Sequence, residues 1–186
     1  MIPCLTRELP SAGEGRVSVE GIEPIATPSV AGIRAARLEE APQLSELCVR
    51  SKAVWGYDET FMALARAALE VRPEHIDAGD VWVATAADGS IAGIVALGPS
   101  DQPRTLDLEK LFVAPERIRS GVGRMLLAYA MAEARRRGAR RVTILSDPYA
   151  AAFYERNGAM RIGVAPSDAV PGRMLPLFEI RLDPAP

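Results

Sequence analysis

The feature that most constrains the fold is an apolar strand that leads through a glycine-containing turn into a long helix, over residues 106–137. The strand LDLEKLFV is followed by a proline, a cluster of arginines, and Gly121-x-Gly123 at the start of the helix RMLLAYAMAEARRRG. Glycines in such a turn let the backbone approach a ligand closely, and a helix N-terminus carries partial positive charge. The turn is therefore predicted to hold an anion, for which a pyrophosphate is the best fit.

Two common phosphate-binding loops do not match this turn. A Walker loop requires Gly-x-x-x-x-Gly-Lys-Ser/Thr, and the chain contains no such run. A dinucleotide-binding loop requires a third glycine, where this chain has Leu126, and it opens the first strand–helix–strand unit of a domain. The turn at 118–124 lies too late in the chain for that role.

The turn resembles motif A of the GCN5-related N-acetyltransferase (GNAT) family, Gln/Arg-x-x-Gly-x-Gly/Ala, which cradles the pyrophosphate of acetyl-CoA. Ile118 occupies the first position, and Arg117 and Arg119 flank it. The segment that follows the next strand resembles motif B, Asn-x-x-Ala-x-x-Phe/Leu-Tyr-Glu-x-x-Gly-Phe. Asp147 replaces the Asn, residues 150 and 153–155 match, and Gly-Ala replaces Gly-Phe. The two motifs come in the family's order, and the resemblance extends over residues 31–183.

The predicted organisation is a flexible N-terminal extension over residues 1–30 and a GNAT N-acetyltransferase domain over 31–183. The expected order is one strand, two helices, three strands, a helix, a strand, a short helix and two strands. This order predicts a mixed α/β (α+β) fold with a largely antiparallel central sheet and helices on both faces, as in the GNAT acyl-CoA N-acyltransferase fold. The dipeptide Asp88-Gly89 predicts a type I′ hairpin, and Pro176 predicts an edge strand or a bulge.

Composition excludes several classes of partner. The 186 residues carry a formal charge of −2, which argues against nucleic acid as the main partner. No apolar run is long enough to cross a membrane, and the N-terminus does not resemble a secretory signal. Cys4 and Cys48 give no metal-binding spacing, so no metal is expected, and they are compatible with a cytoplasmic location. Whether the protein forms a homodimer is left open.

The resemblance also implies which residues contact acetyl-CoA. The main chain of the strand ending in Leu111, Phe112 and Val113 would pair with the pantetheine arm. The turn would wrap the pyrophosphate with Arg119, Ser120, Gly121, Val122, Gly123 and Arg124. Asp147 and Phe153 of motif B are also expected at the cofactor, although Asp147 has an alternative role as a helix cap.

Acetyl transfer in this family is direct, so it needs a proton donor for the thiolate and a proton acceptor for the amine. Tyr154 is the candidate acid, because a phenol stays protonated at neutral pH; its alternative role is packing between helix and sheet. Glu109 is the candidate base, placed on the same strand face as Leu111 and Val113; its alternative is a solvated carboxylate. His75 is expected in a polar surface loop.

The acceptor pocket is expected between two loops, one with Lys52, Trp55 and Tyr57, the other with Arg173. Two cations beside aromatic rings favour a small amine that also carries a carboxylate or phosphate. The predicted function is thus acetyl transfer from acetyl-CoA to a small primary amine. Acetylation of a protein or peptide, and a catalytically silent acetyl-CoA-binding module, are the alternatives.

Overall fold

The computed structural model describes residues 30–182, which form one seven-stranded sheet in the order β1-β2-β3-β4-β5-β7-β6. The predicted extension lies almost wholly outside the described residues. The strands are β1 (Val30–Ala35), β2 (Val81–Ala86), β3 (Ile91–Pro99), β4 (Thr105–Val113), β5 (Arg141–Leu145), β6 (Met160–Pro166) and β7 (Met174–Arg181). The helices are α1 (Ala41–Ala53), α2 (Glu59–Leu69), α3 (Pro73–Asp77), α4 (Val122–Arg136) and α5 (Ala151–Arg156), with 3₁₀ turns η1 (Leu38–Glu40), η2 (Pro115–Arg117) and η3 (Pro148–Ala150).

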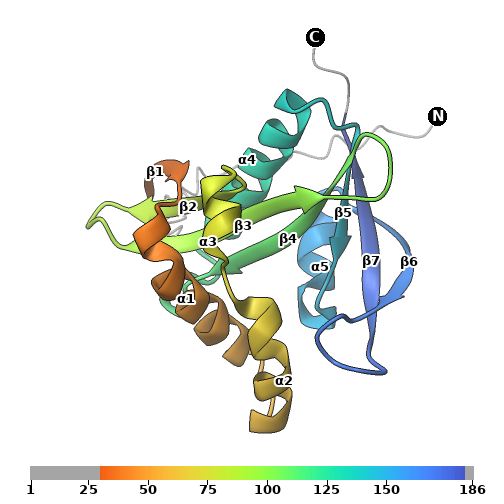
Figure 1. The fold of residues 1–186 in the computed structure, drawn as a ribbon, viewed down its shortest axis with the longest axis horizontal. Helices are drawn as coiled ribbons and strands as arrows, with labels where there is room; N and C mark the ends of the chain where they lie inside the picture. The colour runs from red at the N-terminus through yellow and green to blue at the C-terminus, as the bar shows by residue number, and fades with distance from the viewer. Residues whose placement is uncertain (1–29, 183–186) are drawn as a thin grey trace, which may run out of the picture.

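The predicted fold class is confirmed. Helices α1, α2 and α3 cover one face of the sheet, and α4 and α5 cover the other (Figure 1). All strand pairs are antiparallel except β4 with β5. The short helix α3 is the one addition to the predicted order, and it places His75 in a helix rather than in a loop. Pro73 opens this helix, where a missing N–H costs nothing.

Two apolar layers hold the helices on the sheet. The apolar stripe of α4, including Leu126, Ala130 and Ala134, is fully buried against the strands. On the opposite face, Leu44 and Cys48 of α1 are equally buried. Among residues 30–182, no helix is both long and apolar enough to cross a membrane.

Two local predictions about backbone geometry were wrong. The hairpin between β2 and β3 is not type I′, because only Gly89 has positive φ (81°) and Asp88 does not. Gly89 N–H donates to the carbonyl of Ala86, so a type I turn precedes a left-handed glycine.

Pro176 does not lie on an edge strand, since β7 is paired on both sides, and the register shift in β6 opposite β7 lies at residues 161–163. Instead the carbonyl of Pro176 accepts from Ser146 N–H at 2.9 Å, just past the last β5–β7 pair. Since proline has no N–H to return this bond, the ladder ends there.

Candidate functional site

The site begins where β4 and β5 separate. The two strands pair only through residues 105–107 of β4, and from there to Val113 β4 has a partner only on its β3 side. Figure 1 shows the two strands diverging from this point. A cavity of about 1210 Å³ lies along the opening and is lined by both strands, α2, the α4 turn, α5 and the β6–β7 loop. The unpaired edge of β4 can accept an extended ligand in the place of a neighbouring strand.

A β-bulge in β4 changes the predicted direction of Glu109. Ala96 pairs with Lys110 and Leu97 with Leu108, so Glu109 is the extra residue. Leu111 and Val113 pack with the α4 layer, whereas Glu109 lies 3.5 Å from His75 of α3 on the other face. The prediction that Glu109 shares the face of Leu111 and Val113 was therefore wrong, because one inserted residue reverses the alternation.

Gly98 of β3 has no side chain and so leaves room for that of Glu109. A Cβ built on Gly98 would overlap the carboxylate of Glu109, so the side chain lies directly over this glycine. Glu109 and His75 both line the cavity, on its α3 side.

The predicted anion turn has free donors at the start of α4. The N-cap Gly121 has φ 87° and no side chain caps the helix. Met125 is the first residue of this helix whose N–H donates to a backbone carbonyl, that of Gly121, at 3.1 Å. The preceding N–H groups, from Gly121 to Arg124, are the unpaired donors that every helix N-terminus leaves, and Gly121, Gly123 and Arg124 line the cavity.

The cofactor residues predicted around this turn lie together. Gly123 is packed between Phe153 and Val113, since a Cβ there would lie 3.5 Å from each side chain. Arg119 and Arg124 line the cavity and are exposed, and neither has an ion-pair partner among the described residues. Arg117 instead lies 3.6 Å from Asp88.

Tyr154 is buried but its hydroxyl opens on the cavity. The residue is 7% exposed, packs edge-on against Phe153 and lines the cavity. No described residue hydrogen-bonds its hydroxyl, and none of the described side-chain polar atoms is both sealed from solvent and unpaired. Burial raises the pKa of Tyr154 above that of a free phenol, and the nearby charge of Asp147 adds to the effect. The hydroxyl is thus a protonated, unengaged donor.

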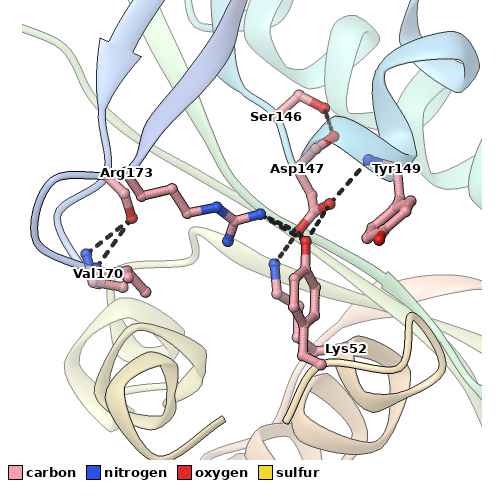
Figure 2. A network of polar contacts seen from close by, with 9 residues as sticks. Lys52, Ser146, Asp147, Tyr149, Val170 and Arg173 are labelled. Carbon is pink, nitrogen blue, oxygen red and sulfur yellow. Dashed lines mark hydrogen bonds and ion pairs between the residues drawn. The ribbon is translucent and has the colours of Figure 1, made fainter. Parts of the chain in front are cut away.

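Three of the predicted acceptor-site residues meet at Asp147. Lys52 at the end of α1, Tyr57 in the α1–α2 loop and Arg173 in the β6–β7 loop all contact its carboxylate. Tyr57 Oη lies 2.9 Å from Asp147 Oδ2, and Arg173 Nη2 donates to Tyr57 Oη at 2.6 Å. Figure 2 shows the side chains of Lys52 and Arg173 both reaching towards Asp147. We call these four residues the clasp, because they join loops on opposite sides of the cavity.

The pKa shifts in the clasp favour an ionised Asp147 carboxylate and a protonated Tyr57 hydroxyl. Burial works against the charge of Asp147, but hydrogen bonds from Lys52 and from Tyr149 N–H outweigh it and hold the pKa of the carboxyl below its usual range. Burial and the bond to Asp147 raise the pKa of Tyr57 to about 12, so its hydroxyl stays protonated. Asp147 also caps η3 through Tyr149 N–H, which was its alternative role.

Aromatic rings surround the clasp. Arg173 lies 4.7 Å from the ring centre of Phe61, and Tyr57 stacks on Phe61 at 3.9 Å. Trp55 stacks on Tyr149 with centroids 5.3 Å apart, and the two rings are 40% and 58% exposed. Exposed aromatic rings at a cavity mouth are available to a ligand.

Sequence reasoning missed several lining residues. Asp107 accepts from the Thr143 hydroxyl at the point where β4 and β5 part. Lys110 lies beside the cavity, and Phe61 of α2 reaches it from a segment that no motif covers. The alternation in β4 was the only available signal for Lys110, and the bulge obscures it. Residues 30–182 contain no cluster of three or more His, Cys, Asp or Glu that could hold a metal ion.

Comparison with known proteins identifies relatives of this arrangement. The model of the Acetyltransferase (GNAT) family matches residues 43–159. A protein assigned to the GNAT family from Desulfovibrio desulfuricans is 25% identical over 82% of this chain and 99% of its own, with a TM-score of 0.61.

Two further solved structures are similar. The PaiA N-acetyltransferase of Thermoplasma acidophilum, in complex with coenzyme A, is 18% identical over 81% of this chain and 98% of its own, with a TM-score of 0.64. Nourseothricin acetyltransferase is 31% identical over 55% of this chain and 65% of its own, with a TM-score of 0.50. No curated protein matches the chain significantly.

Proposed function

The chain belongs to the GNAT family and is an acetyl-CoA-dependent N-acetyltransferase, and we propose that its acceptor is the primary amine of a small metabolite. The observation that carries this proposal is the clasp. Arg173 and Tyr57 connect the β6–β7 loop to the α1–α2 loop at 2.6 Å, so the acceptor side of the cavity is bridged. A small molecule fits behind such a bridge, whereas an extended peptide needs an open groove.

The proposed cofactor site uses the free edge of β4 and the free donors of α4. Pantetheine would pair with the main chain of Leu111–Val113, where β5 is absent as a partner. The pyrophosphate would lie on the N–H groups from Gly121 to Arg124, and Arg119 is placed to meet a further phosphate. Phe153 would support this turn by packing its ring against Gly123.

The proposed chemistry is direct transfer in a ternary complex. The amine attacks the thioester carbonyl, a C–N bond forms, and the C–S bond breaks. One ammonium proton leaves towards Glu109 before the attack. Tyr154 donates its proton to the departing thiolate, and the second proton that the nitrogen loses restores the phenol. Both groups line the same cavity, and Tyr154 enters the reaction protonated because burial raises its pKa.

The charge of the clasp favours an acceptor with an acidic group. Asp147 offsets only one of the two cations Lys52 and Arg173, whose side chains are 14% and 19% exposed. One positive charge of the clasp is therefore left without a negative partner, at a position largely shielded from water. We propose that a carboxylate or phosphate on the acceptor, held by Arg173, completes the balance.

The deciding experiment measures thiol release from acetyl-CoA with matched acceptors. Each amino acid is tested beside its decarboxylated amine, and beside a peptide that carries the same residue. We expect the carboxylated small amines to support the fastest release. Release with peptides alone would replace the proposal by peptide acetylation, and binding of acetyl-CoA without release to any amine would show a silent module.

A further inference from the structure

Lysine is rare in this chain and is confined to the cavity. Of 22 basic residues only Lys52 and Lys110 are lysines, and the other 20 are arginines. Both lysines line the cavity described above. Arginine does not accept acetyl groups in this chemistry, since its guanidinium stays protonated. The side-chain amines of this protein are thus concentrated beside its own acetyl-transfer site.

The two lysines differ in how they are held. Lys52 forms an ion pair with Asp147. Lys110 is 9% exposed and donates to the carbonyl of Ala68, near the end of α2, at 3.0 Å. No carboxylate among the described residues pairs with it at ion-pair distance. Lys110 is therefore a buried amine held by one neutral acceptor.

We propose that Lys110 is a self-acetylation site, which takes the acetyl group of bound acetyl-CoA when no acceptor amine is present. This inference rests on the function proposed above. It follows from the place of Lys110 on β4, next to Leu111. The α4 turn packs against Val113, so the thioester end of a pantetheine arm paired with Leu111–Val113 would lie at the Leu111 end.

The reach of the side chain fits this step. A ligand paired with the free edge of β4 lies about 4.8 Å from the strand, in the position of the missing β5 neighbour. Lys110 packs on the face covered by α1 and α2, and its four-carbon stem spans a comparable distance. Loss of the single bond to Ala68 frees the amine to turn towards the opening.

The protonation state of Lys110 also favours reaction. Burial lowers the pKa of its ammonium, opposed by the smaller effects of Cys48 in α1 and of Glu109 and Glu70. Arg72 acts in the same direction as burial. A larger share of Lys110 is therefore the neutral, nucleophilic amine than of an exposed lysine.

The step balances in atoms and protons. Neutral Lys110 Nζ attacks the thioester carbon, the new C–N bond replaces C–S, and the amine proton leaves as the thiolate is protonated. The products are acetyl-lysine and free coenzyme A. Acetylation removes the charge of Lys110 and its ammonium bond to Ala68, and so loosens the end of α2 that lines the acceptor side.

The test incubates the full chain with acetyl-CoA and no acceptor, and maps acetylated positions by peptide mass spectrometry. We expect one acetyl group on Lys110, formed faster as pH rises. K110R should not gain it, although the arginine can keep the charge and the bond to Ala68. Acetylation confined to Lys52 or the N-terminal amine, or none at all, overturns the inference.

Two controls separate the possible causes. G121D, which is designed not to bind acetyl-CoA, should lose Lys110 acetylation; equal acetylation in that variant means unspecific chemistry and overturns the proposal. Amine-dependent thiol release, measured in the same samples, reports separately on the proposed function. Because acetylation of Lys110 loosens the end of α2 at the acceptor side, preincubation with acetyl-CoA should lower the later rate with an amine in the wild type and not in K110R. An equal rate loss in K110R overturns this effect of Lys110 acetylation.

Discussion

Replacing Tyr154 with Phe should reduce turnover strongly without affecting stability. The hydroxyl makes no hydrogen bond to any described residue, so its removal leaves no partner unpaired. The ring, which packs against Phe153 and Phe178, is retained. We expect the free energy of unfolding to change by less than about 0.5 kcal/mol. A positioned acid contributes about 10²–10⁴-fold, or about 3–5 kcal/mol of barrier, and kcat should fall by that factor.

The assay compares kcat and the acetyl-CoA dissociation constant for wild type and Y154F. The dissociation constant should stay near its wild-type value, since the hydroxyl acts only as the thiolate develops. Y129F is the matched control, because Tyr129 packs against Trp82 away from the cavity. If Y154F keeps wild-type turnover, Tyr154 is a packing residue and the proposed acid is wrong.

Three other substitutions test the remaining roles. R173A should raise the acceptor KM and spare acetyl-CoA affinity; unchanged KM with acidic amines would refute the clasp as their binding site. E109Q should lower kcat, and wild-type kcat in this variant would exclude Glu109 as the base. D147N should destabilise the fold by about 1–3 kcal/mol at neutral pH. Because the folded-state pKa of Asp147 is depressed, its contribution is present above about pH 4 and is lost as pH falls through the folded pKa, so the gap to D147N in denaturant titrations should close in acid.

The sequence predicted the elements because their signals are local. The stripe of α4 from Leu126 to Ala134 and the N-cap Asp58, which accepts from Phe61 N–H at 2.7 Å, follow from short-range rules. Gly121, before α4, has a positive φ of 87°, which glycine adopts readily. The order of motifs A and B along the chain then indicated which strand precedes which helix.

What the sequence did not reveal depends on contacts between distant segments. The register shift at Glu109 is set by pairing with β3 and by the empty space over Gly98, so strand alternation gave the wrong face. The clasp joins Lys52 to Asp147, 95 positions away, and Arg173 to Tyr57, 116 positions away. All four residues were singled out individually, but nothing local indicated that Asp147 would bind both cations. The departure from Asn at this position thus has a structural counterpart in the clasp.

The most direct measurement of the central claim is a calorimetric titration of acetyl-CoA into wild type, G121N and G121D. Gly121 lies at the N-cap of α4 with φ 87°, a conformation that Asn and Asp both tolerate better than most residues. The two side chains are nearly equal in size and differ in charge. If the pyrophosphate lies on this turn, G121N should weaken binding modestly and G121D should abolish it, with both variants folded. Acetyl-CoA affinity in G121D equal to that of G121N would contradict the account.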